Sequence, residues 1–354
     1  MRIKRQNIKS HRAGNTFREY LIDDHGSCKD SKSPNMASRS IHALLLLSLI
    51  VNIHGSPFHP HWQVKKSRPL GYDPDFQPDE SDDVVPDLRI LDDNELQLNE
   101  TANQSAPAAE PATWVIPIGN DDDVEGNAIQ RRFIYGKDDR YLFNNNSYPF
   151  NAVGKLQWSN GVFCSGALVG PRHILTAKHC IVSGATGTFS PGYDQTARDG
   201  SGRVQQIFTS NETWGTPCGW KGDWAVMILD RRLGEKLGYF GAKLPDPRKK
   251  DKPIFRHMGY PSDKDSGTRP YRTDGNPIEG YRAWDCDGTA PYYTDTDCAG
   301  GQSGGPHWEN INGRRYIWGT LSVTFDGGNG VAWAGWGSGN EMVNAIIKAR
   351  RDYP

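Results

Sequence analysis

The stretch at residues 163–180, FCSGALVGPRHILTAKHC, most narrows the folds that are open to this chain. Two short apolar runs, GALVG and HILTA, flank Gly170-Pro171, and this dipeptide is typical of turns. The pattern predicts a β-hairpin. Pairing centred just after the turn would bring Cys164 opposite Cys180, and a disulfide there would add about 3 kcal/mol by the loop-entropy model. It would also fix the backbone that carries His179.

The rest of the composition agrees with a β protein. Many Gly, Trp, Tyr and Thr residues and few long helical patterns predict an all-β fold. The tail NEMVNAIIKARRDY predicts a short C-terminal helix, with Asn340 as its N-cap. Its apolar residues recur at helical spacing at Met342, Val343, Ile346 and Ile347.

The N-terminal third differs in character from the remainder. Residues 1–56 are interpreted as an N-terminal extension and signal peptide, because HALLLLSLIVNIHGS has the length of a signal-peptide core and Met36 offers a natural start. Residues 57–132 are rich in Pro and acidic residues and predict a disordered pro-segment. The dibasic pair Arg131-Arg132 marks a processing site where the composition changes, before a folded domain at 133–354. N-glycosylation sequons begin at Asn99, Asn103, Asn145 and Asn211.

Two further stretches carry candidate chemistry. In DCAGGQSGGP, Ser303 stands among four glycines, which fits either an ordinary glycine-rich loop or a nucleophile on a tight turn. Asp223 stands at the entrance of the apolar strand WAVMIL, where a buried carboxylate needs a partner. That partner is a histidine in one interpretation and a backbone cap in the other.

The order of the candidate residues separates two classes of hydrolase. The stretch GQSGG around Ser303 also fits the nucleophile motif of α/β-hydrolases, in which the histidine follows the serine at a distance. After Ser303 the only histidine is His307, which is too near, whereas His179 and Asp223 precede the serine. The order therefore excludes the α/β-hydrolase interpretation.

The stretches TAKHC, GDWA and GGQSGGP resemble the His, Asp and Ser motifs of the chymotrypsin-like (trypsin-like) serine peptidases. Within that family, IYGKDDR with the following YPF, and YTDTDCAGGQSGGPHW, are similar to the glutamyl endopeptidase branch. The resemblance covers about residues 133–354. It implies two six-stranded antiparallel β-barrels with the site in the cleft between them.

The resemblance also implies a role for each residue. Ser303 would be the nucleophile, His179 the general base and Asp223 the group that orients the imidazole. Backbone N–H groups of Gly301 and Ser303 would form the oxyanion hole. Trypsin-like zymogens usually carry an aspartate before the serine, which pairs with a new N-terminal ammonium. Gln302 cannot form that ion pair, so we expect residues 57–132 to mask the site or to assist folding instead.

The residues that would determine substrate specificity are less well defined by the sequence. The resemblance places candidate substrate-binding residues at Asp297, where trypsin keeps a carboxylate, and at Leu321 or its neighbour Ser322. Glutamyl endopeptidases carry a histidine near Leu321, and its absence here argues against an acid-specific pocket. Lys178 replaces the small residue usual before His179, and its side chain is expected to point away from the site.

The resemblance suggests two disulfides in the mature domain, Cys164–Cys180 and Cys286–Cys298. Cys218 is then left odd, either free or paired in an unexpected way, and Cys28 precedes the leader core and is expected to be absent from the mature form. These features predict a secreted, extracellular glycoprotein made as a zymogen.

Other functions are less favoured by the sequence. The net charge of -1 gives no case for nucleic-acid binding, and no cluster has metal-ligand spacing, so no metal or cofactor is expected. The expected partners are protein or peptide substrates, with no stable membrane association and a monomeric state. The alternative is a catalytically silent peptidase homologue that acts as a binding or regulatory module. A carbohydrate-binding β protein, suggested by 11 Trp, is less favoured, because Trp224 and Trp318 lie in apolar strand runs.

Overall fold

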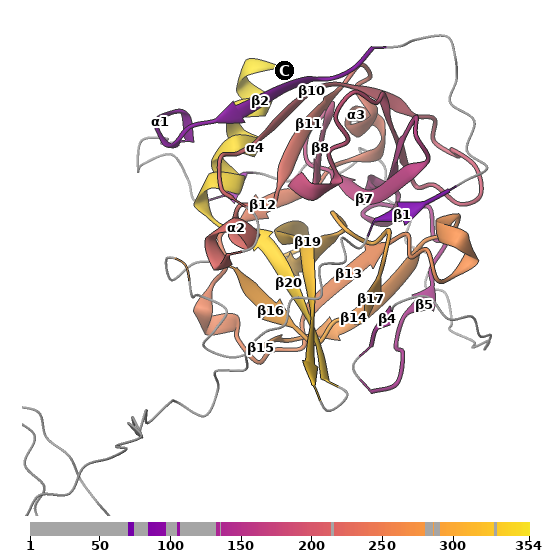
Figure 1. Cartoon of the computed structure of the whole chain (residues 1–354), viewed down its shortest axis with the longest axis vertical. Helices are drawn as coiled ribbons and strands as arrows, with labels where there is room; N and C mark the ends of the chain where they lie inside the picture. The colour runs from indigo at the N-terminus through magenta and orange to yellow at the C-terminus, as the bar shows by residue number, and fades with distance from the viewer. Residues whose placement is uncertain are drawn as a thin grey trace, which may run out of the picture. The chain divides into compact units, whose positions relative to one another are not determined.

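A computed structural model describes residues 70–73, 84–96, 105–106, 132–134, 136–213, 216–279, 286, 291–328 and 331–354. The described residues form two curved β-sheets, and the strands of the two sheets occupy the upper and lower halves of the view in Figure 1. The expected leader, its Met36 start, Cys28 and the sequons at Asn99 and Asn103 lie outside the described residues.

The first sheet closes into a six-stranded antiparallel barrel. Its strands follow the order β7-β6-β9-β10-β11-β8, and β8 pairs again with β7. The predicted hairpin is confirmed: Ala167 pairs with Leu175 and Leu168 with Ile174 around the Gly170-Pro171 turn. The strands are β6 (Val153–Trp158), β7 (Val162–Leu168), β8 (His173–Thr176), β9 (Gly187–Pro191), β10 (Gly202–Ser210) and β11 (Ala225–Leu229).

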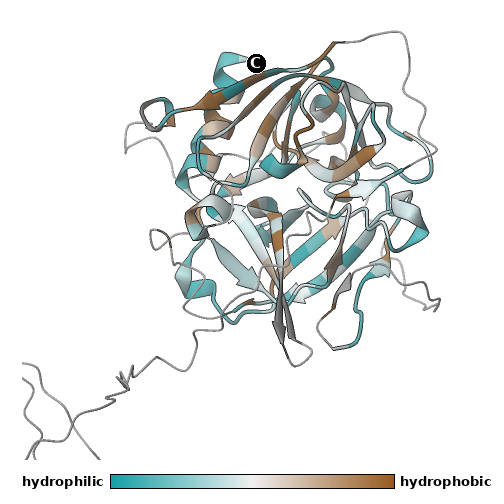
Figure 2. Cartoon of the chain, viewed as in Figure 1, coloured by the Kyte–Doolittle hydropathy of each residue, from teal (hydrophilic) through white to brown (hydrophobic). Residues whose placement is uncertain are grey.

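Burial of apolar side chains stabilises the closed barrel. All five residues of β11 and all four of β8 are buried. Figure 2 shows strong hydrophobic colour in this part of the molecule. Two short helices connect the strands and the sheets, α2 (Pro217–Lys221) and α3 (Leu233–Leu237). A 3-10 turn at Lys178–Cys180 follows β8 and carries His179.

The second sheet is a curled half-barrel, with the order β15-β16-β20-β19-β18-β13-β14-β5. The chymotrypsin-like prediction is therefore confirmed, although among the described strands this second sheet is open at its edges, where a closed barrel was expected. Its strands are β5 (Tyr141–Leu142), β12 (Gly241–Lys243), β13 (Phe255–Gly259), β14 (Tyr271–Asn276), β15 (Ile278–Glu279), β16 (Tyr292–Thr294), β18 (Pro306–Ile311), β19 (Arg314–Gly328) and β20 (Val331–Ser338). A separate pair joins β4 (Arg132–Phe133) to β17 (Cys298–Ala299).

Parts of the expected pro-segment are folded onto these sheets. The described parts comprise β1 (Gly71–Tyr72), β2 (Asp87–Leu91), α1 (Asp93–Leu96) and β3 (Ser105–Ala106). β1 pairs with β7, β2 runs parallel to β10, and β3 pairs with β12. These short elements are ordered by backbone pairing with strand edges of the two sheets, and the assignment of residues 57–132 as a pro-segment stays a prediction.

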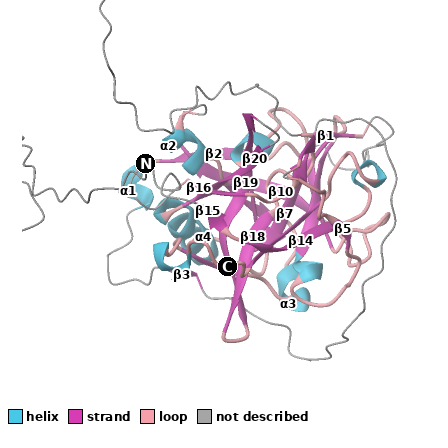
Figure 3. Ribbon diagram, turned by 90° about the horizontal axis from the view of Figure 1, so that it is seen from below, coloured by secondary structure: helices cyan, strands magenta, loops and turns pink. Residues whose placement is uncertain are grey.

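The predicted C-terminal helix is α4 (Asn340–Asp352), and it packs on the first barrel. The buried Met342, Val343 and Ile346 form its inner face. Its N-cap is Gly339, one residue before the predicted Asn340. Figure 3 shows α1 and β3 beside α4. Among the described residues, no helix has the length and apolar character that crossing a bilayer requires.

Candidate functional site

The Asp223 carboxylate holds His179 by two hydrogen bonds. Oδ1 accepts the backbone N–H of His179 at 2.9 Å, and Oδ2 lies 2.7 Å from its Nδ1. Because a carboxylate accepts, Nδ1 carries the proton and donates it. The other ring nitrogen, Nε2, then has a lone pair, and it makes no hydrogen bond with any residue that the structure describes. The imidazole is therefore oriented as a general base.

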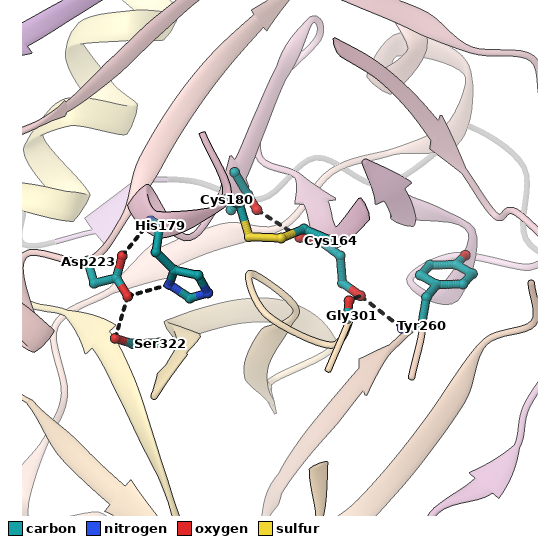
Figure 4. The surroundings of a disulfide bond; sticks show 9 residues. Cys164, His179, Cys180, Asp223, Tyr260, Gly301 and Ser322 are labelled. Carbon is teal, nitrogen blue, oxygen red and sulfur yellow. Dashed lines mark hydrogen bonds and ion pairs between the residues drawn. A yellow bond between two sulfur atoms is a disulfide. The ribbon is translucent and has the colours of Figure 1, made fainter. Parts of the chain in front are cut away.

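A third group completes the surroundings of Asp223. The hydroxyl of Ser322, on β19, donates to Oδ2 at 2.6 Å, as Figure 4 shows. Asp223 is 0% exposed, so these hydrogen bonds offset the cost of burying its charge. Asp223 lies before β11 of the first barrel and Ser322 in the second sheet, so the two sheets meet at this carboxylate.

The Ser303 loop lies against the chain that leads into His179. The carbonyl of Ser303 accepts the N–H of Ser165 at 2.8 Å. A Cβ added to Gly304 would lie 2.9 Å from the backbone nitrogen of Ala177, two residues before His179. The Cys164–Cys180 disulfide joins the same two stretches and is confirmed. The nucleophile candidate and the histidine thus approach from the second sheet and the first barrel.

Glycine is required at two positions of this loop. Gly301 and Gly304 have φ angles of 90° and 80°, in the region that favours glycine. A Cβ on Gly301 would also lie 2.4 Å from the carbonyl oxygen of Tyr260. The loop is held to β19 because Gly304 donates to the carbonyl of Leu321, and Leu321 donates to that of Gly305. This explains the glycines in the sequence and why Leu321 is buried.

Two cationic groups border the site. Lys178 points away from it, as predicted, since its Nζ donates to the carbonyls of Ser210 and Glu212. Burial lowers the pKa of Lys178. The second cation is Arg140, whose Nη1 donates to Oε1 of Gln302 at 3.1 Å.

The predicted Cys286–Cys298 disulfide is wrong. Cys286 pairs with Cys218, the residue that was expected to be odd, and Cys298 is a buried free cysteine. Burial raises the pKa of Cys298 to about 12, which keeps its thiol protonated and unreactive. The pairing with Cys218 links α2, beside the first barrel, to the segment before β16.

The Asp297 carboxylate is engaged by the protein's own backbone. It is buried, and its Oδ2 accepts the N–H of Asp139 at 2.8 Å. This hydrogen bond joins the loop before Ser303 to the segment at Asp139, and a substrate role for Asp297 stays a prediction. Within the described part of the chain, no group of three or more His, Cys, Asp or Glu residues is arranged to hold a metal ion.

Comparison with known proteins agrees with this geometry. The model of the family described as Trypsin matches residues 142–333. The chain belongs to the trypsin family. It is 26% identical over 315 residues to a glutamyl endopeptidase of Bacillus licheniformis, which covers 81% of this chain and 89% of that protein. The family match and the similarity to a glutamyl endopeptidase indicate that the protein is a peptide hydrolase.

Other similarities cover less of the chain or show the fold alone. Serine protease 23 of Mus musculus is 42% identical over 72 residues, 19% of this chain and 18% of that protein. Inactive serine protease 35 of Rattus norvegicus is 46% identical over 59 residues, 16% and 14% of the two chains. The structure of a Glu endopeptidase in complex with MPD aligns with a TM-score of 0.51 and 22% identity, covering 62% of this chain and 99% of that one.

Sequence reasoning missed two buried cations near the site. Arg140 and Lys155 are both buried, although a charged residue is ordinarily expected at the surface. The DDR run before Tyr141 is a weak signal for the first, because two acidic residues directly precede the arginine. For Lys155 the only signal is its position inside the otherwise apolar strand that runs through VGKL.

Proposed function

We propose that the protein is a secreted serine endopeptidase that hydrolyses peptide bonds through Ser303, His179 and Asp223. One observation carries the proposal. Asp223 orients the imidazole through Nδ1 and the backbone N–H, and the Ser303 loop packs against the chain just before that histidine. The trypsin family supports the peptidase class, and the triad is what we add to it.

In the proposed reaction, Oγ of Ser303 attacks the carbonyl carbon of the substrate and transfers its proton to Nε2 of His179. The negative oxygen of the tetrahedral intermediate accepts hydrogen bonds from the N–H groups of Gly301 and Ser303. His179 then donates the proton to the leaving amine, which leaves an acyl-enzyme ester on Ser303. Water, deprotonated by the same imidazole, hydrolyses the ester. Asp223 stabilises the imidazolium in both steps.

The segment 57–132 fits a pro-segment in this scheme. Its described strands cover the edges of the catalytic domain at β7, β10 and β12. We propose cleavage at Arg131-Arg132, after a leader has directed the chain to secretion. The two disulfides agree with an oxidising compartment.

Ser303→Ala tests the proposal. We expect kcat for peptide hydrolysis to fall about 10⁵- to 10⁶-fold, since the nucleophile is removed from a group that acts as a unit. Unfolding should be unchanged. Ser183→Ala, in an exposed turn just after His179, is the matched control and should keep full activity. Peptide cleavage and thermal melting are measured on the same preparations.

Labelling with a fluorophosphonate separates an enzyme from a silent homologue. The similarity to an inactive serine protease, although limited to 59 residues, gives that alternative a specific basis. We expect a single adduct on the tryptic peptide that contains Ser303, and none in Ser303→Ala. A folded wild-type protein that takes up no label and cleaves no peptide would establish the silent homologue.

A further inference from the structure

Lys155 is a buried ammonium group with few partners. It lies on β6, its side chain is 1% exposed, and its Nζ makes no hydrogen bond with any described residue. Nζ lies 4.3 Å from the centroid of the Phe163 ring and 5.2 Å from that of Tyr193. Burial lowers the pKa of Lys155 to about 8, and the Asp73 carboxylate opposes that shift. An ammonium carries three donors, so this one retains unused capacity for a carboxylate.

A short extended segment places an acidic group next to this lysine. In β1, Gly71 pairs with Phe163 and Tyr72 with Val162, and the next residue, Asp73, donates its N–H to the carbonyl of Gly161 at 2.8 Å. Figure 1 shows β1 lying beside β7. Oδ2 of Asp73 lies 3.9 Å from Nζ of Lys155.

The backbone of this segment resembles a bound peptide in two respects. Its hydrogen bonds go to a strand edge, which is how extended peptides add to sheets. Its acidic side chain lies between two donors, because Oδ2 of Asp73 also accepts from Nε2 of Gln157 at 3.3 Å. A side chain on Gly71 would overlap the Phe163 ring, with its Cβ only 2.1 Å from Cζ, so only glycine permits this close approach.

The lysine pocket adjoins the candidate oxyanion loop. The Phe163 ring that lies beneath Nζ of Lys155 also fills the space beside Gly301, where a Cβ would come within 2.4 Å of Cε2. Tyr193 packs edge-on against Tyr260, with ring centroids 6.0 Å apart. In Figure 4, Tyr260 and Gly301 lie on the side of the Cys164–Cys180 disulfide away from His179. A peptide on this edge would therefore reach the loop that carries Ser303.

We propose that Lys155, Gln157, Phe163 and Tyr193 form a substrate subsite that binds an aspartate or glutamate side chain of an extended peptide. Asp73 occupies this subsite in the unprocessed chain. The inference rests on the proposed peptidase function. It concerns a different part of the substrate from Asp297 and Leu321. The acidic preference follows from the lysine, whose charge is paired only at a distance.

A binding experiment tests the subsite without using catalysis. The probe is a fluorescein-labelled peptide with the sequence of residues 68–76, RPLGYDPDF, and a second probe carries Asn in place of the first Asp. Both are titrated against the full chain with Asp73→Asn, which weakens the tethered occupant. We expect the acidic probe to bind about tenfold more tightly, as a desolvated charge pair would require. Adding Lys155→Met, of similar volume but uncharged, should bring the two affinities together.

Kinetics provide the second test and do not depend on the folding of the Lys155 variant. Asp73→Asn should raise kcat/KM several-fold for peptides with an aspartate at one position near the scissile bond. Asp87→Asn, an exposed residue on β2, is the matched control and should change nothing.

The subsite is wrong if both probes bind equally in the presence of Lys155, or if Asp73→Asn and Asp87→Asn behave alike. A protein that selects the acidic probe yet never reacts with a fluorophosphonate would contradict the proposed function and leave the subsite supported.

Discussion

Gln302, the residue before the candidate nucleophile, is held by a cation from within the domain. Its Oε1 accepts from Nη1 of Arg140 at 3.1 Å and from the N–H of Ala299 at 2.9 Å. The same guanidinium makes paired hydrogen bonds with the carboxylates of Asp138 and Asp263. Burial opposes the charge of Asp138, but Arg140 outweighs it and lowers the pKa of Asp138 to about 2. The loop that carries Gly301 is therefore braced by an internal ion network.

Gln302→Leu tests whether this ion network is needed for catalysis. Two buried donors would lose their acceptor, and each such loss costs about 1–3 kcal/mol. We expect kcat to fall at least about tenfold while KM changes little, because the loop stabilises the transition state more than the bound substrate. Gln206→Leu is the control, since Oε1 of Gln206 accepts no hydrogen bond from the described residues. Equal kcat in the two variants would show that the brace is dispensable.

Single residues show how far the sequence alone can predict the site. His179, Asp223 and Ser303 could be proposed as a triad because their residue types, order and flanking glycines are all visible along the chain, and the structure brings the Asp223 carboxylate to His179. Disulfide pairing is different, because it depends on which Cβ atoms meet in space. Cys298 is the nearest cysteine to Cys286 in the sequence. The cysteine that pairs with Cys286 is instead Cys218, whose Cα lies 5.1 Å from that of Cys286. Sequence proximity gave the wrong partner.

At the level of elements, α4 fastens the end of the second sheet to the first barrel. His173, at the start of β8, donates from Nε2 to the carbonyl of Ala349 in α4 at 3.1 Å. Arg350 extends this contact, because its Nη2 donates to the carbonyl of Phe240. His173 is 0% exposed. Its burial outweighs the hydrogen bond to Ala349 and lowers its pKa to about 4.

The lowered pKa of His173 predicts acid sensitivity. An unfolded histidine titrates near 6.5, so protons favour the unfolded chain as the pH falls from about 6.5 to 4, and stability is lost across that range. Lowering the pH from 7 to 4.5 should therefore reduce the free energy of unfolding by about 2 kcal/mol through this group. His173→Gln lacks the titrating ring. In this variant, the difference between the free energies of unfolding measured with urea at pH 7 and pH 4.5 should be smaller by that amount. An unchanged difference would contradict the assignment.

Elements were predicted best where a periodic apolar pattern coincides with a turn or cap. The β7–β8 hairpin and α4 satisfy that condition. The strands of the expected pro-segment do not. β2 alternates polar and apolar residues in DLRIL, but four of its five residues are exposed, so the alternation does not mark a buried face. β2 finds a partner because β9 pairs with only Gly202 and Arg203 of β10, which leaves the rest of that edge open, and this opening depends on pairings between strands far apart in the sequence. The open second sheet has the same origin, in long-range pairings that leave no local signal.

At the scale of the whole molecule, the first barrel and the second sheet meet at Asp223 through two of the contacts around the site. One is the Asp223 carboxylate with Ser322, and the other is the close approach of β20 to that same aspartate. A Cβ on Gly337 would lie 2.5 Å from the carbonyl oxygen of Asp223. The Cys218–Cys286 disulfide crosses between the two parts nearby, from α2, which packs against β20. Stability and catalysis should therefore depend on different covalent links.

The two disulfides allow that separation to be measured. Cys218 and Cys286 are 68 residues apart and Cys164 and Cys180 are 16, so the loop-entropy model gives about 4 and about 3 kcal/mol of unfolding free energy. Replacing Cys218 and Cys286 with serine should lower the free energy of unfolding more, yet leave kcat/KM within about threefold, because α2 carries none of the three proposed catalytic residues. Replacing Cys164 and Cys180 should destabilise less but lower kcat/KM by at least about tenfold, because the turn that carries His179 loses its anchor, and a 1 Å misplacement can cost 10²-fold. Urea unfolding followed by tryptophan fluorescence, with peptide cleavage on the same samples, measures both quantities. Losses of activity that simply follow the losses of stability would mean that the short disulfide has no positioning role.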